Sequence, residues 1–168
     1  MIYKLIGSFV LLVAGGYVSL SIIRFEKRRL RVLDGYISLI YYIKGQIDCY
    51  AMPLSDILAS ADPAVLAACL GLDGQTNPLP PVLTADRPIT AMVEESRLYL
   101  EPEVERLLTT LTGELGSTYR TEQVARCDHY LSALTRERRK LGDSLPARLR
   151  AVCTLCLCSA VVAALLLW

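Results

Sequence analysis

Few residues of this chain have the types and spacing that catalysis or cofactor binding needs. His129 is the only histidine among the 168 residues, which removes most metal sites and most acid–base machinery. We expect it on the polar side of its helix, as a solvated surface residue. The segment from Gly71 to Gly74 lacks the Lys-Ser/Thr of a phosphate-binding loop, and no nucleophile elbow is present. The sequence therefore predicts no enzyme activity and no cofactor.

Cysteines form the pattern that comes nearest to a metal site. Cys153, Cys156 and Cys158 follow a Cys-x-x-Cys-x-Cys spacing. They lie inside a charge-free C-terminal run, where thiolates are costly, and no fourth ligand is evident. We expect them to act as small apolar residues, with acylation of Cys153 as the alternative. Cys49, Cys69 and Cys127 are expected to be reduced and mostly buried.

Two charge-free runs lie near the ends of the chain. Leu5 to Ile23 contains 19 residues and Ala151 to Trp168 contains 18. As helices they span about 27–28 Å, close to the hydrocarbon thickness of a bilayer. The alternative for the first run is a cleaved signal peptide, whose apolar core is shorter; for the second it is a buried core helix. We predict transmembrane helices over residues 2–23 and 151–168.

The charges are strongly segregated along the chain. Residues 35–135 contain 6 Lys/Arg and 13 Asp/Glu, a net of −7, whereas residues 24–31 and 136–150 each carry +4. Lys and Arg beside a membrane helix are retained in the cytosol, so residues 24–150 are expected to form a cytosolic domain in contact with anionic lipid headgroups. An acidic middle repels nucleic acid. The basic residues that flank the predicted spans most closely are Arg24, Lys27, Arg28, Arg29, Arg31, Arg148 and Arg150.

Helical periodicity predicts the elements of the central domain. The first helix should continue without a break toward Pro53, because apolar stripes recur at helical spacing (Leu30, Leu33, Ile37, Ile40, Ile47; Val32, Tyr36, Leu39, Ile43). Pro53 and Pro63 are typical of first helical turns. Residues 71–88 are rich in Gly and Pro and predict a loop, after which Ile89, Met92, Val93 and Ser96 share a helical face. The fold class is all-α.

A helical hairpin is predicted in the second half. Pro102 should open a helix with an acidic first turn and the core stripe Val104, Leu107, Leu108, Leu111 and Leu115. Gly116 is placed to end this helix. The next helix carries the stripe Val124, Cys127, Leu131, Leu134 and Leu141, interrupted by Arg138. Gly142, Asp143, Ser144 and Pro146 predict a break or kink before residue 151.

Two short motifs stand out: one is Gln46-Ile47 with Pro53-Leu54, and the other is Leu115-Gly116 with Gln123. Both resemble segments of the stage III sporulation protein AB family. Gln46-Ile47 followed by Pro53-Leu54 is similar to the family's Glu-Ile-x-Tyr…Pro-Leu segment, and Leu115-Gly116 followed by Gln123 is similar to its Leu-Gly…Asp…Gln turn. The chain departs from the family at Gln46, Cys49 and Tyr119, where Glu, Tyr and Asp are common. For Gly116 and Gln123 we favour a structural role in the hairpin over direct contact with a partner.

This resemblance implies a non-enzymatic platform or adaptor subunit of a sporulation channel complex. Its helical middle would be related to the cytosolic domains of type II secretion inner-membrane F proteins. The subunit would lie in the mother-cell membrane, contact other subunits of the complex, and dock a secretion-type ATPase on the cytosolic side. The alternatives are a generic helical membrane adaptor unrelated to sporulation, and a small membrane enzyme, for which the chain offers no cluster of polar catalytic groups.

Overall fold

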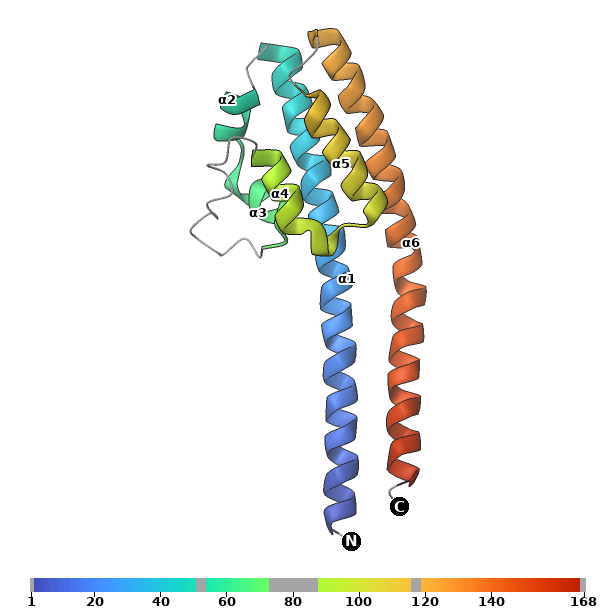
Figure 1. Cartoon of the computed structure of the whole chain (residues 1–168). Coiled ribbons are helices and arrows are strands. Elements are labelled where there is room, and N and C mark those ends of the chain that lie inside the picture. The colour runs from blue at the N-terminus through green and yellow to red at the C-terminus, as the bar shows by residue number, and fades with distance from the viewer. Residues whose placement is uncertain (1, 51–53, 73–87, 116–118, 167–168) are drawn as a thin grey trace. The chain divides into compact units, whose positions relative to one another are not determined.

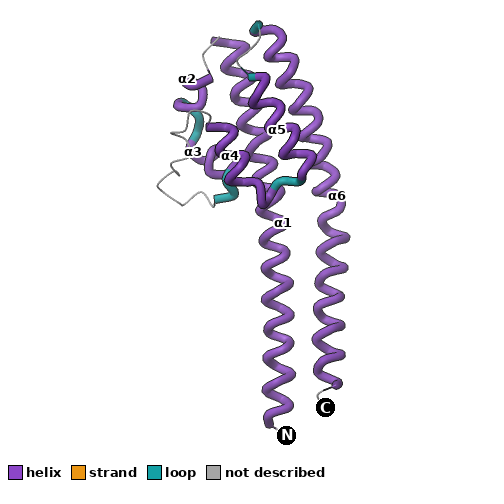
Figure 2. The backbone as a smooth tube through the Cα atoms, viewed as in Figure 1, coloured by secondary structure: helices purple, strands orange, loops and turns teal. Residues whose placement is uncertain are grey.

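The computed structural model describes residues 2–50, 54–72, 88–115 and 119–166. All regular elements in these ranges are helical (Figures 1 and 2), which confirms the predicted all-α class. They are α1 (Ile2–Tyr50), α2 (Leu54–Ala59), α3 (Pro63–Cys69), α4 (Pro88–Ser96), the short 3-10 helix η2 (Arg97–Tyr99), α5 (Pro102–Glu114) and α6 (Arg120–Leu166). Pro88, the last residue of the predicted loop, is the first of α4. Residues 73–87 of that loop lie outside the described residues.

The chain divides into two compact units. One, which we call the terminal unit, comprises residues 1–27 and 141–168; the other, the bundle, comprises residues 28–140. Residues 2–23 of the first predicted membrane span lie in α1 and residues 151–166 of the second lie in α6, both in the terminal unit; residues 167 and 168 lie outside the described residues. In the part of the chain that the structure describes, no helix has an apolar stretch long enough to cross a bilayer.

The second half of α1 is the central helix of the bundle. Both predicted stripes face inward from Val32 onward: Val32, Leu33, Tyr36, Leu39, Ile40, Ile43 and Ile47 are buried, and Ile37 is partly buried against them. Leu30, the first predicted residue, is half-buried and is not part of this core. Because two stripes cover a wide face, α1 must be contacted by several neighbours. Side chains from α2, α3, α4, α5 and α6 all join the same core cluster. No proline interrupts α1, so it continues without a break from Ile2 to Tyr50, as predicted.

A glycine allows α3 to lie directly against α1. A Cβ atom at Gly35 would be 2.7 Å from the backbone nitrogen of Cys69 and 2.8 Å from the carbonyl carbon of Ala68. These are backbone atoms at the C-terminal end of α3, which cannot move aside as a flexible side chain can. The close approach of the two helices therefore requires glycine at this position.

Both ends of α3 have well-formed caps. Pro63 occupies the first turn, as predicted, and the Asp62 carboxylate accepts a hydrogen bond of 2.8 Å from the Ala64 N–H. At the other end Gly71 has φ +67°. The N–H of Leu72 donates to the Ala67 carbonyl and that of Gly71 to the Ala68 carbonyl, both at 2.9 Å. This is the Schellman arrangement, in which glycine takes the left-handed position.

One polar pair lies inside the apolar core. The hydroxyls of Tyr36 on α1 and Ser96 on α4 are 2.8 Å apart, and both residues are fully buried. Ser96 also lies 2.8 Å from the Met92 carbonyl oxygen. Burial raises the pKa of Tyr36 well above its ordinary value of 10.0, so its hydroxyl stays neutral. The pair fixes where α4 meets α1, because a buried hydroxyl without a partner is costly.

The helical hairpin of α5 and α6 follows the sequence closely. Pro102 opens α5 with Glu103 and Glu105 in the first turn. Val104, Leu108 and Leu111 are buried, and Leu107 and Leu115 are partly buried. On α6, Cys127, Leu134 and Leu141 are buried. Tyr130 and Ala133, which the predicted stripe left out, are also buried there.

Of the predicted break or kink at residues 142–146, the break is wrong. α6 continues from Arg120 to Leu166 with Pro146 inside it. A proline removes one backbone donor and crowds the carbonyl four residues earlier, which here belongs to Gly142. The loss of one hydrogen bond does not end a helix that extends for many residues on both sides.

The expectation for Cys49 is also wrong. Cys69 and Cys127 are buried, but Cys49 is exposed. It follows Ile47 by two residues, and the buried face of α1 ends there, so that Asp48, Cys49 and Tyr50 all face solvent.

Replacing Gly35 with alanine should destabilise the bundle, because the new methyl group meets the backbone of α3. We expect a loss of about 1–3 kcal/mol in the free energy of unfolding of the purified full chain, measured by denaturant titration. Gly45 on the same helix is the matched control, since nothing lies within 4 Å of its Cβ position. Gly45→Ala should stabilise α1 by up to about 1 kcal/mol. Equal effects of the two substitutions would contradict the close approach of α1 and α3.

Because of Tyr36, the stability of the bundle should fall at alkaline pH. Its pKa is raised in the folded state, so its contribution is complete below pH 10.0, the ordinary pKa of tyrosine, and is lost as the pH rises above that value. The loss reaches at most about 1.4 kcal/mol per pH unit. Tyr36→Phe should cost about 0.5–1.5 kcal/mol at neutral pH and should remove this part of the pH dependence. Parallel pH profiles for the wild type and Tyr36→Phe would contradict a buried neutral hydroxyl.

Candidate interaction surface

The two family-type motifs lie at one end of the bundle. The first is at the C-terminal end of α1 and the second spans the α5–α6 connection. Arg120 Nη2 lies 3.5 Å from the Asp48 carboxylate, which joins the start of α6 to the end of α1 (Figure 1). We call this region, made of Ile47–Tyr50, Leu54, Leu115 and Tyr119–Gln123, the motif end.

The motif residues differ in how they are placed. Leu54 is the first residue of α2, and Leu115 follows the last residue of α5; both are partly buried against the common core. Gln123 is half-buried in the first turn of α6, and its N–H donates to the Tyr119 carbonyl at 3.0 Å. Pro53 and Gly116 lie outside the described residues. The apolar members thus contribute packing to the motif end.

A network of ion pairs and one hydrogen bond connects α5 to α6 next to this end. Arg126 on α6 contacts the carboxylates of Glu114 at 3.0 Å and Glu122 at 2.8 Å, and the Tyr130 hydroxyl donates to Glu114 at 3.1 Å. Burial, together with the hydrogen bond to Glu114, raises the pKa of Tyr130. Two side chains of α6, those of Arg126 and Tyr130, therefore converge on Glu114 and join the first turns of α6 to the C-terminal end of α5.

Ion pairs at the surface join α1 to α6. Lys44 Nζ lies 2.6 Å from the Asp128 carboxylate, and Arg138 donates to both oxygens of Asp34 at 2.9 and 3.3 Å. The hydrogen bond to Asp128 raises the pKa of Lys44, and that to Asp34 raises the pKa of Arg138. Arg138, which interrupts the apolar stripe of α6, is thus explained by a partner on α1. Nothing in the sequence pattern identified Asp34 as that partner.

The motif end displays two tyrosine side chains to solvent. Tyr50 is 71% exposed and Tyr119 is 87% exposed. The backbone of Tyr119 is nevertheless fixed, since its carbonyl accepts hydrogen bonds from the N–H groups of Glu122 and Gln123, both at 3.0 Å. Tyrosine and arginine are enriched where proteins contact one another. The motif end thus combines a hydrogen-bonded backbone with exposed aromatic side chains, the composition common at protein contact surfaces.

The basic residues beside the predicted spans fall into two groups. Arg24, Lys27, Arg31, Arg148 and Arg150 are exposed. Arg28 and Arg29 are half-buried and contact residues of η2 and α5. Arg28 donates to the Tyr99 hydroxyl at 3.0 Å, and Arg29 contacts the Glu101 carboxylate at 2.9 Å. The sequence reading gave these two arginines a topological role and missed their part in tying η2 and α5 to α1.

The histidine and the buried cysteines of the bundle show no feature of a reactive or metal-binding group. His129 is exposed, as expected. Burial raises the pKa of the Cys69 thiol to about 12, and burial also raises that of Cys127, which keeps both thiols protonated and unreactive. Among the described residues, no three His, Cys, Asp or Glu side chains are grouped closely enough to hold a metal ion.

The fold and this surface define a class: an all-helical protein in which a bundle is built around one long helix and presents exposed tyrosines at one end. The chain belongs to the stage III sporulation protein AB family, whose sequence pattern matches residues 4–168. It is therefore a sporulation-related protein, and the resemblance read from the two short motifs is confirmed. No curated protein and no solved structure matches the chain.

Reversing one charge of the Lys44–Asp128 pair should weaken the contact between α1 and α6. Lys44→Glu places two carboxylates together, so the denaturation midpoint of the full chain should fall, and more at low salt than at high salt. Exchanging the two charges, in the double variant Lys44→Glu with Asp128→Lys, should restore most of the loss. Additive effects of the two single substitutions would contradict a direct ion pair.

Proposed function

We propose that this protein is a non-enzymatic membrane platform or adaptor subunit of a sporulation complex, and that its motif end docks a secretion-type ATPase. The observation that carries the proposal is that two motifs separated by more than sixty residues come together at one end of the bundle. Family membership supports the sporulation context. The platform role and the ATPase are inferences from the resemblance.

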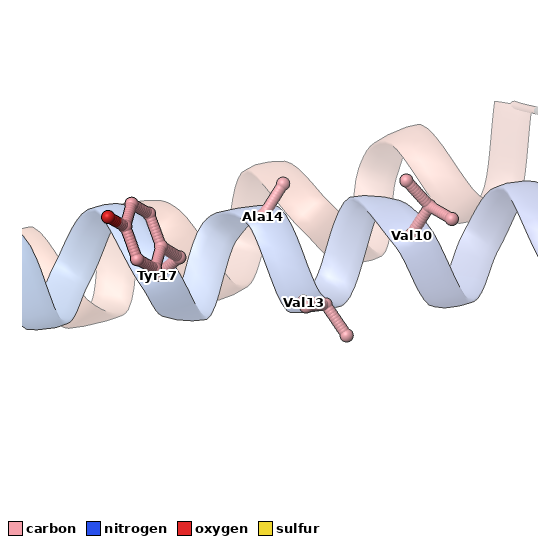
Figure 3. A pocket seen from close by; sticks show the side chains of 4 residues that line it. All are labelled: Val10, Val13, Ala14 and Tyr17. Atoms are coloured by element: carbon pink, nitrogen blue, oxygen red, sulfur yellow. The ribbon is translucent and has the colours of Figure 1, made fainter.

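Membrane attachment is supported by the sequence at both ends of the chain. The uncharged runs Leu5–Ile23 and Ala151–Trp168 have the length of membrane helices. In the terminal unit, apolar side chains of α1 face outward: Val10, Val13 and Tyr17 are each more than half exposed. Together with Ala14 they line a shallow apolar depression on α1 (Figure 3). Exposed apolar surface of this extent is suited to lipid acyl chains.

The orientation follows from the basic flanks. Exposed Arg24, Lys27, Arg148 and Arg150 border the two runs on the side of the bundle, so the positive-inside rule favours a cytosolic bundle. In a sporulating cell, the resemblance implies that the membrane is that of the mother cell. The motif end, at the C-terminal end of α1, would then face the cytosol.

Docking at the motif end is supported by its composition. Tyr50 and Tyr119 provide large apolar area with little conformational freedom to lose on binding. Arg120 and Asp48 lie beside them and add charged contacts at the rim. The polar contacts of Arg126 between α5 and α6 preorganise this surface, which lowers the entropic cost of binding.

Alanine substitution of both exposed tyrosines should reduce ATPase recovery. We would tag the full chain in the native host, crosslink sporulating cells, extract with detergent and quantify the secretion-type ATPase that co-purifies. Truncating one interface anchor costs about 1–2 kcal/mol, which corresponds to about five- to thirtyfold in affinity. Tyr50→Ala with Tyr119→Ala should therefore lose most of the signal.

Tyr41 offers a matched control, since it is 70% exposed on the same helix but lies away from the motif end. Tyr41→Ala should leave recovery unchanged. If recovery of the ATPase persists in the double variant, the motif end is not the docking site. If even the wild type yields no ATPase, the proposed function itself is wrong.

A further inference from the structure

The outward face of α1 in the terminal unit carries a regular apolar stripe. Its members are each more than half exposed, and we call them the seam: Val10, Val13, Tyr17 and Leu20. On the opposite side of the helix, Gly15, Ser19 and Ile22 are half-buried within the same unit. Steps of three, four and three residues are the spacing of the a and d positions of a coiled coil. The seam therefore has the pattern that packs against a further helix.

The depression on this face has the form of a coiled-coil hole. It is lined by Val10, Val13, Ala14 and Tyr17, which are positions i, i+3, i+4 and i+7 of α1 (Figure 3). In a coiled coil each knob side chain inserts into a hole made by four residues of the facing helix. With Val10 and Tyr17 at a positions and Val13 at d, these four residues form the hole for a d knob. The knob that fits is Val13 itself, from a second copy of α1 in the same register.

A parallel pair of these helices is self-complementary. About a two-fold axis between the helices, Val13 of each copy enters the hole of the other, which is the isologous arrangement of a symmetric dimer. Ala14, at the e position, carries only a methyl group, so the two helices can approach closely. Copies that insert into a membrane with the same orientation are also parallel to one another.

The Tyr17 hydroxyl needs a partner from outside its own helix. Ser19, Ser21, Thr154 and Ser159 each donate to a carbonyl oxygen three or four residues earlier, at 2.7–3.0 Å. These hydroxyls are therefore satisfied within their helices. The Tyr17 side chain is 69% exposed, and its hydroxyl has no hydrogen-bond partner in the part of the chain that the structure describes. A hydroxyl without a partner in hydrocarbon is costly.

Tyr17 lies too deep to satisfy its hydroxyl at the membrane surface. It precedes Ile23, the last residue of the uncharged run, by six residues, or about 9 Å along the helix axis. That distance is longer than a tyrosine side chain, so headgroups and water are out of reach when the run spans the hydrocarbon. In the parallel pair both Tyr17 side chains occupy a positions and meet at the two-fold axis, where one hydroxyl can donate to the other. A polar residue at an a position also fixes the register of a coiled coil.

We propose that the N-terminal part of α1 pairs in parallel with the same segment of a second copy through the seam, and that the two Tyr17 hydroxyls hydrogen-bond across the two-fold axis. This pairing joins two subunits within the membrane. The inference rests on the membrane part of the proposed function and is independent of the ATPase.

Disulfide crosslinking in membranes of the native host tests the pairing. The full chain is expressed there with the cysteines that are not buried replaced by alanine: Cys49, Cys153, Cys156 and Cys158. Val13→Cys or Leu20→Cys then adds one thiol on the seam, and an oxidant is applied to carbonate-washed membranes. Both variants should give a crosslinked dimer, because equivalent d positions face each other across the axis of a parallel pair.

Val18→Cys is the matched control, because Val18 is 50% exposed on the same helix but lies off the seam. It should give no more dimer than the background without an added thiol. Ala14→Leu, combined with Val13→Cys, fills the hole and should lower the dimerisation constant at least about fivefold, measured from the crosslinked fraction over a range of expression levels. Tyr17→Phe removes the hydroxyl pair and should lower it about threefold.

The outcomes separate the pairing from membrane attachment. If the chain stays in the washed membranes and Val13→Cys crosslinks no better than Val18→Cys, the pairing is overturned and membrane attachment stands. Crosslinking at Val13 without crosslinking at Leu20 would overturn the parallel arrangement. A crosslink to a different protein in place of the dimer would overturn the second copy as the occupant of the seam. If carbonate extracts the chain from the membranes, both the pairing and the membrane proposal fail.

Discussion

The second half of α1 has to bury one wide apolar face made of two adjacent stripes, and the other elements of the bundle are arranged to meet that requirement. Short α2 and α3 cover part of it, α4 another part, and the α5–α6 hairpin the rest. At Gly35 the backbones of α1 and α3 meet without a side chain between them. A helix with a single apolar stripe would need only one neighbour.

Polar contacts determine the register of this packing rather than its strength. Apolar burial is non-directional, so it does not by itself fix where along α1 each neighbour lies. Tyr36 and Ser96 set the position of α4, Arg28 and Arg29 set that of η2, and Lys44 with Asp34 set that of α6. Exposed ion pairs contribute little stability individually, but their spacing permits one alignment of α1 with α6.

Prediction from the sequence succeeded for features that depend only on residues close together in the chain. The stripes of α1 and α5 and the proline starts of α3 and α5 are local signals, and the structure confirms them. Pro146 was misleading because its cost is local, while the helix around it is sustained on both sides. The partners of Arg28, Arg29 and Arg138 were not predictable, since charge pattern alone does not show which carboxylate or hydroxyl, some 70–100 residues away, meets each arginine. The convergence of the two motifs likewise needs the three-dimensional fold.

The ion pairs between α1 and α6 join positions 72, 84 and 104 residues apart in the chain. During synthesis, α1 is therefore complete long before the helix that closes the bundle exists. At about 5–20 residues per second, the apolar stripes of α1 wait on the order of ten seconds for α6. Over that interval the nascent chain exposes a surface that invites aggregation or chaperone binding. The order in which the ribosome makes the two long helices thus leaves part of the apolar face of α1 uncovered until α6 has been made.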